Sequence, residues 1–406
     1  MLNKLGDWNS EIAKIIKSFF FLFFNFLLIP LVLLVSIFDL FCKVRFVLIR
    51  DDRIGHFAWI TELFLRRVKL KIINGKQTLF IGIASTNPSN KQLLKMFKRK
   101  MKIIQLPLFI WKVINYTFFN ERSILIKLKL IFGHFDVKGT EFYEINNSKP
   151  ILKFTPNEEE RGRQLLQKMG LGKDDWFVCF HARDSFFLKK KVGTDIIPAY
   201  RNWNIRDALK AMEYIVSKGG FAIRMGSLVE KELKTNNPKI IDYASKFRSD
   251  FGDIYLSGKC KLFIGHGSGI NWVAEIFNIP VAWVNTIPFE YPPCNKKDIY
   301  IPKKFWLIKE KKMLTFAGIL KLKLGSTMDT KEYDDAGIKL IENTPQEILD
   351  LVIEANERLD GTWKTTEEDE KLQQRFKSLF KKGSPCYGFP SRLGSKFLRE
   401  NRQLLE

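Results

Sequence analysis

The stretch "CKLFIGHGSGINWVAEIFNIPVAWVN" (Cys260 to Asn285) joins an apolar run, a turn of glycine, histidine and serine, a helical pattern and a second apolar run. Continuous apolar runs of this length are typical of strands that are buried on both faces of a parallel sheet. The order strand, helix, strand is the unit from which such sheets are built. The stretch therefore predicts an α/β fold.

The same alternation extends outward in both directions. Strands are expected at 45–49, 78–84, 102–106, 176–180, 221–226, 261–267 and 281–285, with helical patterns between them. Asn87 and Asn157 are expected to cap helices, and Thr344 with Glu347 forms a capping box. We therefore expect two Rossmann-like domains, 45–155 and 156–330, followed by a helical C-terminal extension, 331–406.

The N-terminal residues 1–44 differ from the rest. "FFFLFFNFLLIPLVLLVSIFDLF" (Phe19 to Phe41) carries one charge and has the roughly 20 residues that a membrane-spanning helix needs. It predicts a membrane segment, with an interfacial hairpin or a buried core helix as the alternatives. No cleavage pattern of small residues follows it. Basic residues after it favour a cytoplasmic position for the body of the chain.

The chain has 67 lysines and arginines against 44 aspartates and glutamates, a net charge of +23. This balance suits an anionic partner, such as a phosphate-rich ligand or an anionic membrane surface. No zinc-finger spacing or basic recognition helix accompanies the charge, so a nucleic acid partner is not expected. The five cysteines are scattered, which is typical of free thiols in a reducing compartment.

The turn Gly265-His266-Gly267-Ser268-Gly269 allows three interpretations. A nucleophile elbow requires the frame G-x-S-x-G, which this turn lacks. A purely structural turn would need its glycines for positive φ. The third interpretation is a phosphate cradle, because Gly267, Ser268 and Gly269 lead into the N-terminus of a helix, where backbone N–H groups bind anions. We favour the cradle.

Polar residues also follow the other expected strands. "FHARDSFF" places His181 and Arg183 on the same side of an extended segment, although Arg183 could instead pair with an aspartate within the loop. Arg201, Arg224 and Arg248 lie at strand ends or in adjoining loops. Each arginine alone is typical of a solvated surface charge. Together they predict a pocket for a diphosphate, which arginine grips bidentately.

Several of these segments together resemble a family of bacterial glycosyltransferases. They are "RIGHFAWITELF", "FVCFHARD", "YRNWNIRDALKAMEYIVSKGGFAIRMG", "YASKFRSDFGDIYLSGKCKLFIGHGSGI" and "IPVAWVN", within residues 45–330. The resemblance implies a GT-B fold, with the nucleotide-sugar donor in the C-terminal domain and the acceptor in the N-terminal domain. It also implies a role in the synthesis of cell-envelope polysaccharide.

Two more distant resemblances concern single motifs. The H-x-R element is similar to that of fucosyltransferases, where it holds a nucleotide diphosphate, which implies this role for Arg183. The Ser-Gly turn is similar to that of heptosyltransferases, which implies that Ser268 and Gly269 contact the donor phosphates. Before this pair the family has a small polar residue, whereas this chain has His266 and Gly267.

Sugar transfer must neutralise a departing diphosphate and deprotonate an acceptor hydroxyl. The chain has no D-x-D motif, so we expect no metal and no other cofactor, with arginines and the helix N-terminus stabilising the leaving group. His56, which follows the first strand, is the first candidate for the base. Asp52 and Glu62 are its alternatives, and His181 is a candidate catalytic residue in the second domain.

The acceptor is expected to be a glycan or a lipid-linked molecule near the membrane. The expected location is the bacterial inner membrane, with the catalytic part on the cytoplasmic face. Two other functions stay open at this point. One is a non-catalytic, membrane-bound module that binds nucleotide sugars or polyanions, and the other is a serine hydrolase.

Overall fold

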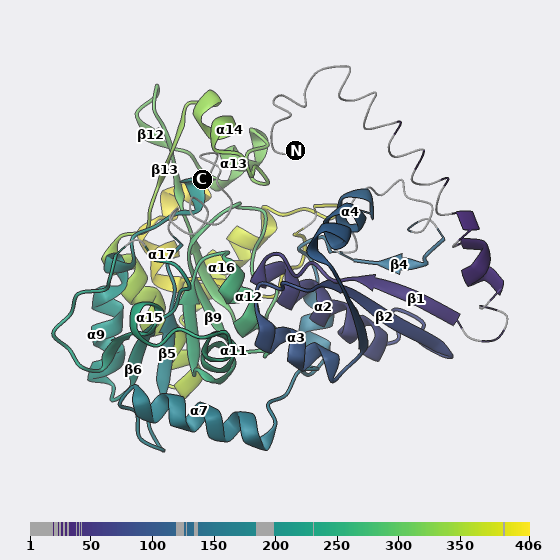
Figure 1. The fold of residues 1–406 in the computed structure, drawn as a ribbon. Coiled ribbons are helices and arrows are strands. Elements are labelled where there is room, and N and C mark those ends of the chain that lie inside the picture. Colours follow the sequence, from purple (N-terminus) through teal and green to yellow (C-terminus); the bar gives the residue numbers. More distant parts are fainter. Residues whose placement is uncertain are drawn as a thin grey trace. The chain divides into compact units, whose positions relative to one another are not determined.

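The computed structural model describes residues 19, 23, 26, 29–30, 32–37, 39, 41, 43–118, 126, 128–133, 137–183, 199–229, 231–384 and 386–406. These residues form two compact units, one from residues 1–89 with 97–137 and the other from residues 90–96 with 138–406. Each unit is built on a parallel sheet (Figure 1). The predicted α/β class is therefore confirmed.

The first unit has a four-stranded parallel sheet in the order β3-β2-β1-β4. The strands are β1 (Lys43–Leu48), β2 (Thr78–Ser85), β3 (Lys102–Leu106) and β4 (Ile131–Phe132), and the helices are α2 (Ile54–Lys69) and α4 (Leu108–Phe118). Most of helix α3 (Lys91–Lys98) belongs to the second unit. Phe64 of α2 packs against Phe80 and Phe132, with ring centroids 5.0 and 5.6 Å apart. This aromatic contact holds α2 on the sheet.

Most of the expected membrane segment, residues 19–41, lies outside the described residues. Among the residues that the structure does describe, no helix is both long enough and apolar enough to cross a bilayer. Residues 32–37 are helical, and Val35 is buried in a cluster with Leu48, Leu130 and Ile131.

The second unit has a seven-stranded parallel sheet in the order β14-β10-β9-β8-β5-β6-β7. The strands are β5 (Phe177–Phe180), β6 (Phe221–Arg224), β7 (Ile240–Asp242), β8 (Leu262–Gly265), β9 (Val281–Thr286), β10 (Ile299–Pro302) and β14 (Arg392–Leu393). From β7 to β10 the order is that of a Rossmann sheet, in which the strand order reverses between β5 and β8.

The second unit contains the following helices, several of which contact the strands of this sheet (Figure 1). They are α6 (Phe142–Asn147), α7 (Pro156–Lys168), α9 (Leu209–Ser217), α10 (Tyr243–Lys246), α11 (Asp250–Lys259), α12 (Gly269–Ile276), α13 (Phe316–Lys321), α14 (Thr330–Asp335), α15 (Pro345–Asp360), α16 (Glu367–Ser378) and α17 (Ser395–Glu400), with the short 3₁₀ helices η3 (Ala199–Arg201), η4 (Ile205–Ala208) and η5 (Arg402–Leu405). The capping box of Thr344 and Glu347 is present at α15, as predicted.

The second unit contains strands that the sequence analysis did not predict, among them β7 and β10 of the main sheet. The strands β11 (Lys304–Leu307), β12 (Lys312–Met313) and β13 (Ile338–Ile341) form a small antiparallel sheet that the pattern did not indicate. The C-terminal extension is not purely helical, because β14 adds a parallel strand beside β10. The extension is thereby joined to the main sheet.

Two predicted helix starts are also wrong by a few residues. Helix α7 is capped by Thr155, which forms a capping box with Glu158, and not by Asn157. Helix α3 begins at Lys91, and the Asn90 side chain accepts a hydrogen bond from Leu93 N, whereas Asn87 was expected as the cap. In both cases another residue that can cap a helix stands within three positions.

Candidate functional site

The candidate site lies at the carboxyl edge of the second unit's sheet, where the strand order reverses. In such sheets ligands bind outside the carboxyl ends of the strands at this point. The segment 181–183 follows β5, and the turn 265–269 follows the neighbouring strand β8. The sheet order therefore brings together the two motifs that the sequence singled out.

His181 is held by two backbone groups beside β5. Its N–H donates to Ile264 O at 2.9 Å, and its Nδ1 lies 3.1 Å from Met225 O. A carbonyl oxygen only accepts hydrogen bonds, so this contact places a proton on Nδ1. Nε2 is then the ring nitrogen that can accept a proton in the neutral imidazole.

The turn after β8 is tightly packed, and close contact explains its first glycine. A Cβ on Gly265 would lie 2.6 Å from the amide atoms of Asn271, and one on Gly267 would lie 3.6 Å from Arg201 Nη2. None of the three glycines of the turn has a positive φ. The interpretation as a turn that needs its glycines for positive φ is therefore wrong, and the Arg201 guanidinium lies beside the turn.

Ser268 is the N-cap of α12 and is 8% exposed. Its hydroxyl donates to Asn271 Oδ1 at 2.9 Å instead of accepting from the helix backbone. The Ser268 proton is therefore directed to an amide and not to an imidazole, which disfavours the serine hydrolase. The first N–H groups of α12 carry the positive end of the helix dipole.

His266 is fully buried at the centre of this turn. Neither of its ring nitrogens has a hydrogen-bond partner within the part of the chain that the structure describes. The pKa of His266 is held well below its ordinary value. Burial is the largest cause, and nearby positive groups lower the pKa further. These groups are Arg201, Lys303, Arg183 and His181.

Arg201 and Arg183 approach the turn from one loop each. Trp203 N donates to Arg183 O at 3.3 Å, which ties the segment after β5 to the loop that carries Arg201. Arg201 lies over the ring of Tyr200, 6.0 Å from its centroid. Burial raises the pKa of Tyr200, while both arginines act to lower it, so both charges lie near this ring.

Lys303 is a site residue that the sequence prediction missed. It follows β10 and is 3% exposed, and its ammonium donates to Asn202 O at 2.9 Å and to Glu342 Oε1 at 3.4 Å. Burial lowers its pKa, and the Glu342 charge partly offsets this effect. Like His266, Lys303 directly follows a strand, and this position was the available signal. We call Arg183, Arg201, Lys303 and His266 the basic cluster.

Two predicted phosphate-binding arginines instead pair with acidic side chains. Arg224 Nη1 lies 3.2 Å from Asp242 and donates to Lys231 O at 2.8 Å, and both side chains of the pair are buried. Arg248 bonds to Asp253 at 2.9 Å and to Asp250 at 3.0 Å. In this structure both guanidinium groups tie loops together, so we do not include them in the basic cluster.

The candidate bases lie in the first unit, where β1 leads into α2. Asp52 bonds to Arg50 at 3.1 Å. Burial acts to raise the pKa of Asp52, but the hydrogen bond and charge of Arg50 outweigh it, and the pKa is lowered. His56 is exposed in the first turn of α2. Asp52 is therefore the weaker base, and the imidazole of His56 is open to solvent.

Glu62 is unsuited to act as a base in this structure. It is fully buried in α2 and bonds to Arg66 at 3.0 Å, and neither side chain is exposed. A residue that the sequence analysis passed over, Asp51, instead organises the strand ends. It accepts from Ser85 N at 2.7 Å and Ser85 Oγ at 2.8 Å, which joins the loops after β1 and β2. Burial, the largest cause, raises the pKa of Asp51.

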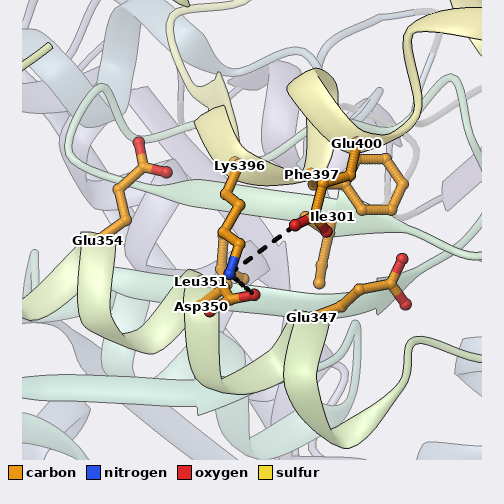
Figure 2. Close-up of a pocket in the computed structure, with 9 residues that line it drawn as sticks. Ile301, Glu347, Asp350, Leu351, Glu354, Lys396, Phe397 and Glu400 are labelled. Carbon is orange, nitrogen blue, oxygen red and sulfur yellow. Dashed lines mark ion pairs between the residues drawn. The ribbon is translucent and has the colours of Figure 1, made fainter.

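A small cavity lies between α15 and α17 and is shown in Figure 2. Lys396 Nζ bonds to Asp350 at 2.9 Å and lies 3.8 Å from Glu400. The cavity of about 10 Å³ has room for about one water molecule. It is therefore too small for a nucleotide. Among the described residues, no group of three or more His, Cys, Asp or Glu is arranged to hold a metal ion.

A buried pair of carboxyl groups, Asp298 and Glu275, is linked to the turn after β8 through Trp283. Asp298 accepts from Val281 N at 2.9 Å and from Trp283 Nε1 at 3.0 Å, and the Trp283 ring lies beside Gly267. Burial raises the pKa of Asp298 to about 6. Its hydrogen bonds, which include one with Glu275, act to lower the pKa but do not outweigh burial. The Asp298 carboxyl group therefore stays protonated to a higher pH than an ordinary aspartate.

No family model and no curated protein matches this chain. Three solved structures are similar at low identity. A glycosyl transferase family 9 protein from Veillonella parvula is 14% identical, with a TM-score of 0.45, over 78% of this chain and 96% of that one. The ADP-heptose LPS heptosyltransferase II of E. coli is 14% identical, with a TM-score of 0.42, over 78% and 99%.

The E. coli heptosyltransferase WaaC with ADP is 10% identical, with a TM-score of 0.36, over 72% of this chain and 99% of that one. Likenesses of this size do not assign the chain a family or an activity. The interpretation of the site therefore rests on its own residues.

The carboxyl pair predicts a specific pH dependence of stability. Because the folded pKa of Asp298 lies above its unfolded value, the proton stabilises the fold at low pH, and this contribution is lost as the pH rises through about 6. Asp298→Asn removes the titrating carboxyl group and serves as the comparison. We expect the wild type to lose on the order of 2 kcal/mol more than the variant between pH 4.5 and 7.5. Calorimetric unfolding of both proteins measures this difference, and parallel curves would contradict it.

Proposed function

We propose that this chain is a glycosyltransferase that moves a sugar from a nucleotide-sugar donor to a glycan or lipid-linked acceptor. The observation that carries the proposal is the basic cluster at the point where the strand order of the second unit reverses. A diphosphate leaving group develops negative charge, and fixed cations with helix N–H groups stabilise that charge. Arg183, Arg201 and Ser268 are the proposed phosphate contacts, and the reaction is proposed to need no metal.

The donor site can be tested with nucleoside diphosphates added to the full chain without metal. We expect one of them to raise the unfolding temperature, because a ligand that binds only the folded state stabilises it. Arg183→Ala and Ser268→Ala should each weaken binding, the arginine change by about 10- to 100-fold for a lost charge-assisted contact. Lys210→Gln, which removes an exposed charge on α9, is the control that should bind normally.

Two outcomes would contradict parts of this proposal. If none of the nucleoside diphosphates stabilises the protein, the basic cluster is not a donor site. If one binds tightly but no sugar is transferred to any acceptor fraction, the chain is a non-catalytic module for nucleotide sugars.

His56 is the proposed general base for the acceptor hydroxyl. Among the candidates in the first unit, it alone is an exposed imidazole, the side chain that most often acts as a general base. His56→Ala should lower the turnover number by about 10²- to 10⁴-fold and leave the affinity for the nucleoside diphosphate unchanged. Steady-state transfer and equilibrium binding measure the two effects separately. An unaffected turnover number would exclude His56 as the base.

We further propose that the chain acts at the cytoplasmic face of a bacterial inner membrane. The support is the described part of the N-terminal helix, where Leu33, Leu34 and Ile37 are more than half exposed while Val35 is buried against the sheet. Exposed apolar groups of this kind insert into the interface of a bilayer, and the net charge of +23 favours anionic lipids.

Co-sedimentation with phosphatidylcholine vesicles, with and without phosphatidylserine, tests the membrane proposal. The triple change Leu33→Ser, Leu34→Ser and Ile37→Ser should reduce the bound fraction because the apolar contact is lost. The matched control replaces three similarly exposed apolar residues of the second unit, Ile308, Leu322 and Met328, with serine. Equal binding of both variants would refute the proposed contact.

A further inference from the structure

A neutral imidazole buried without hydrogen bonds is costly, and His266 is such a group. Both of its ring nitrogens are polar, fully enclosed and without partners among the described residues. Leaving a buried donor or acceptor unsatisfied costs the desolvation free energy of that group without the gain of a hydrogen bond. His266 lies two residues before Ser268, the N-cap of α12, and the N–H groups of this helix N-terminus favour an anion.

The charges around His266 explain why it is neutral in the free protein. Positive groups approach it from three directions: Arg183 and His181 follow β5, Arg201 lies in η3, and Lys303 follows β10. The acidic groups near this surface are Glu342, which bonds to Lys303, Asp329, which acts on Tyr200, and the buried pair Asp298 and Glu275, which is linked to the turn through Trp283. The charges that act most strongly on His266 are positive, so a proton on His266 would be repelled.

A bound diphosphate would reverse this balance. It brings at least two negative charges to a turn whose His266 and Ser268 side chains are buried, and an opposite charge favours the protonated imidazole. The imidazolium has two N–H donors and no acceptor, so it can donate a hydrogen bond to a phosphate oxygen. The ligand would thereby give a partner to a buried ring nitrogen that has none among the described residues of the free protein.

We propose that His266 takes up one proton when a diphosphate occupies the turn between β8 and α12, and that the imidazolium then donates a hydrogen bond to a phosphate oxygen. This inference rests on the proposed function, since it assigns the diphosphate to the same site. The proton comes from solvent when the ligand binds and returns to solvent when it leaves, so no other bond is made or broken. Lys303 and Arg201 supply the remaining positive charge.

The direct test is ¹⁵N NMR of the full chain with ring-labelled histidine, using inorganic pyrophosphate as the probe. The chain has four histidines, so the spectrum is simple, and His266→Gln identifies the signal. Without ligand, the His266 signal should stay at neutral-imidazole shifts between pH 8 and 6. With saturating pyrophosphate, both of its ring nitrogens should move to imidazolium shifts. Unchanged His266 signals at saturation would overturn the inference.

The pH dependence of affinity gives a second readout. Binding linked to one proton should strengthen by up to about tenfold per pH unit as the pH falls. Pyrophosphate itself titrates in this range, so the measured quantity is the difference between the wild type and His266→Gln. We expect the wild type to gain about tenfold more affinity than the variant between pH 8 and 6. Equal gains would contradict the proposal.

Further variants separate this proposal from a structural role. Lys303→Met should weaken pyrophosphate binding but retain the change in the His266 signal, whereas Lys210→Gln should alter neither. If His266→Gln does not fold, variants of the other three histidines identify the His266 signal by elimination. Failure of pyrophosphate to bind would overturn this inference alone, because the proposed function depends on the nucleoside diphosphates. If a nucleoside diphosphate binds while His266 stays neutral, the proposed donor site stands and only the proposed proton uptake by His266 is refuted.

Discussion

The burial of positive charge at the carboxyl edge of the second sheet is the constraint on which the candidate site depends. Lys303 is 3% exposed, and its main partners are one carbonyl oxygen and the partly exposed Glu342. Removing such a charge from water costs several kcal/mol unless it is well paired. The strand order and the packing of the loops hold it there in the free protein, so a bound anion need not reorganise the site.

The strands could be predicted because each is a continuous apolar run, and burial on both faces of a parallel sheet demands that pattern. The seven expected strands are all present within a few residues of their predicted limits. The antiparallel strands β11 to β13 were missed because each is short and lies among lysines, and only β11 leads into an apolar run, Phe305 to Ile308. Helix caps were ambiguous where Thr155 and Asn157, or Asn87 and Asn90, stand close together and either can cap.

The arginines show how far the candidate site could be predicted from the sequence. In the sequence Arg183, Arg201 and Arg224 look alike, since each lies at or just beyond the end of a strand or beside a loop. What separates them is the tertiary partner: β6 and β7 pair in a register that sets Arg224 opposite Asp242, 18 residues away. No local pattern contains this register. Lys303 was missed for the converse reason, because its burial depends on Asn202 and Glu342, which are distant in the sequence.

The same electrostatics bear on how a leaving group would be stabilised. A divalent metal ion that approached the free site would meet the charges of Arg183, Arg201 and Lys303, all of its own sign. A diphosphate meets charges of the opposite sign, together with the first N–H groups of α12. Fixed cations of this kind are oriented by folding and not by the reaction, so the cost of orienting them does not fall on the chemical step. His266, a titratable group among these cations, adds positive charge only when the anion is present. In the free protein it is neutral, so it does not repel the three cations as a fourth permanent cation would.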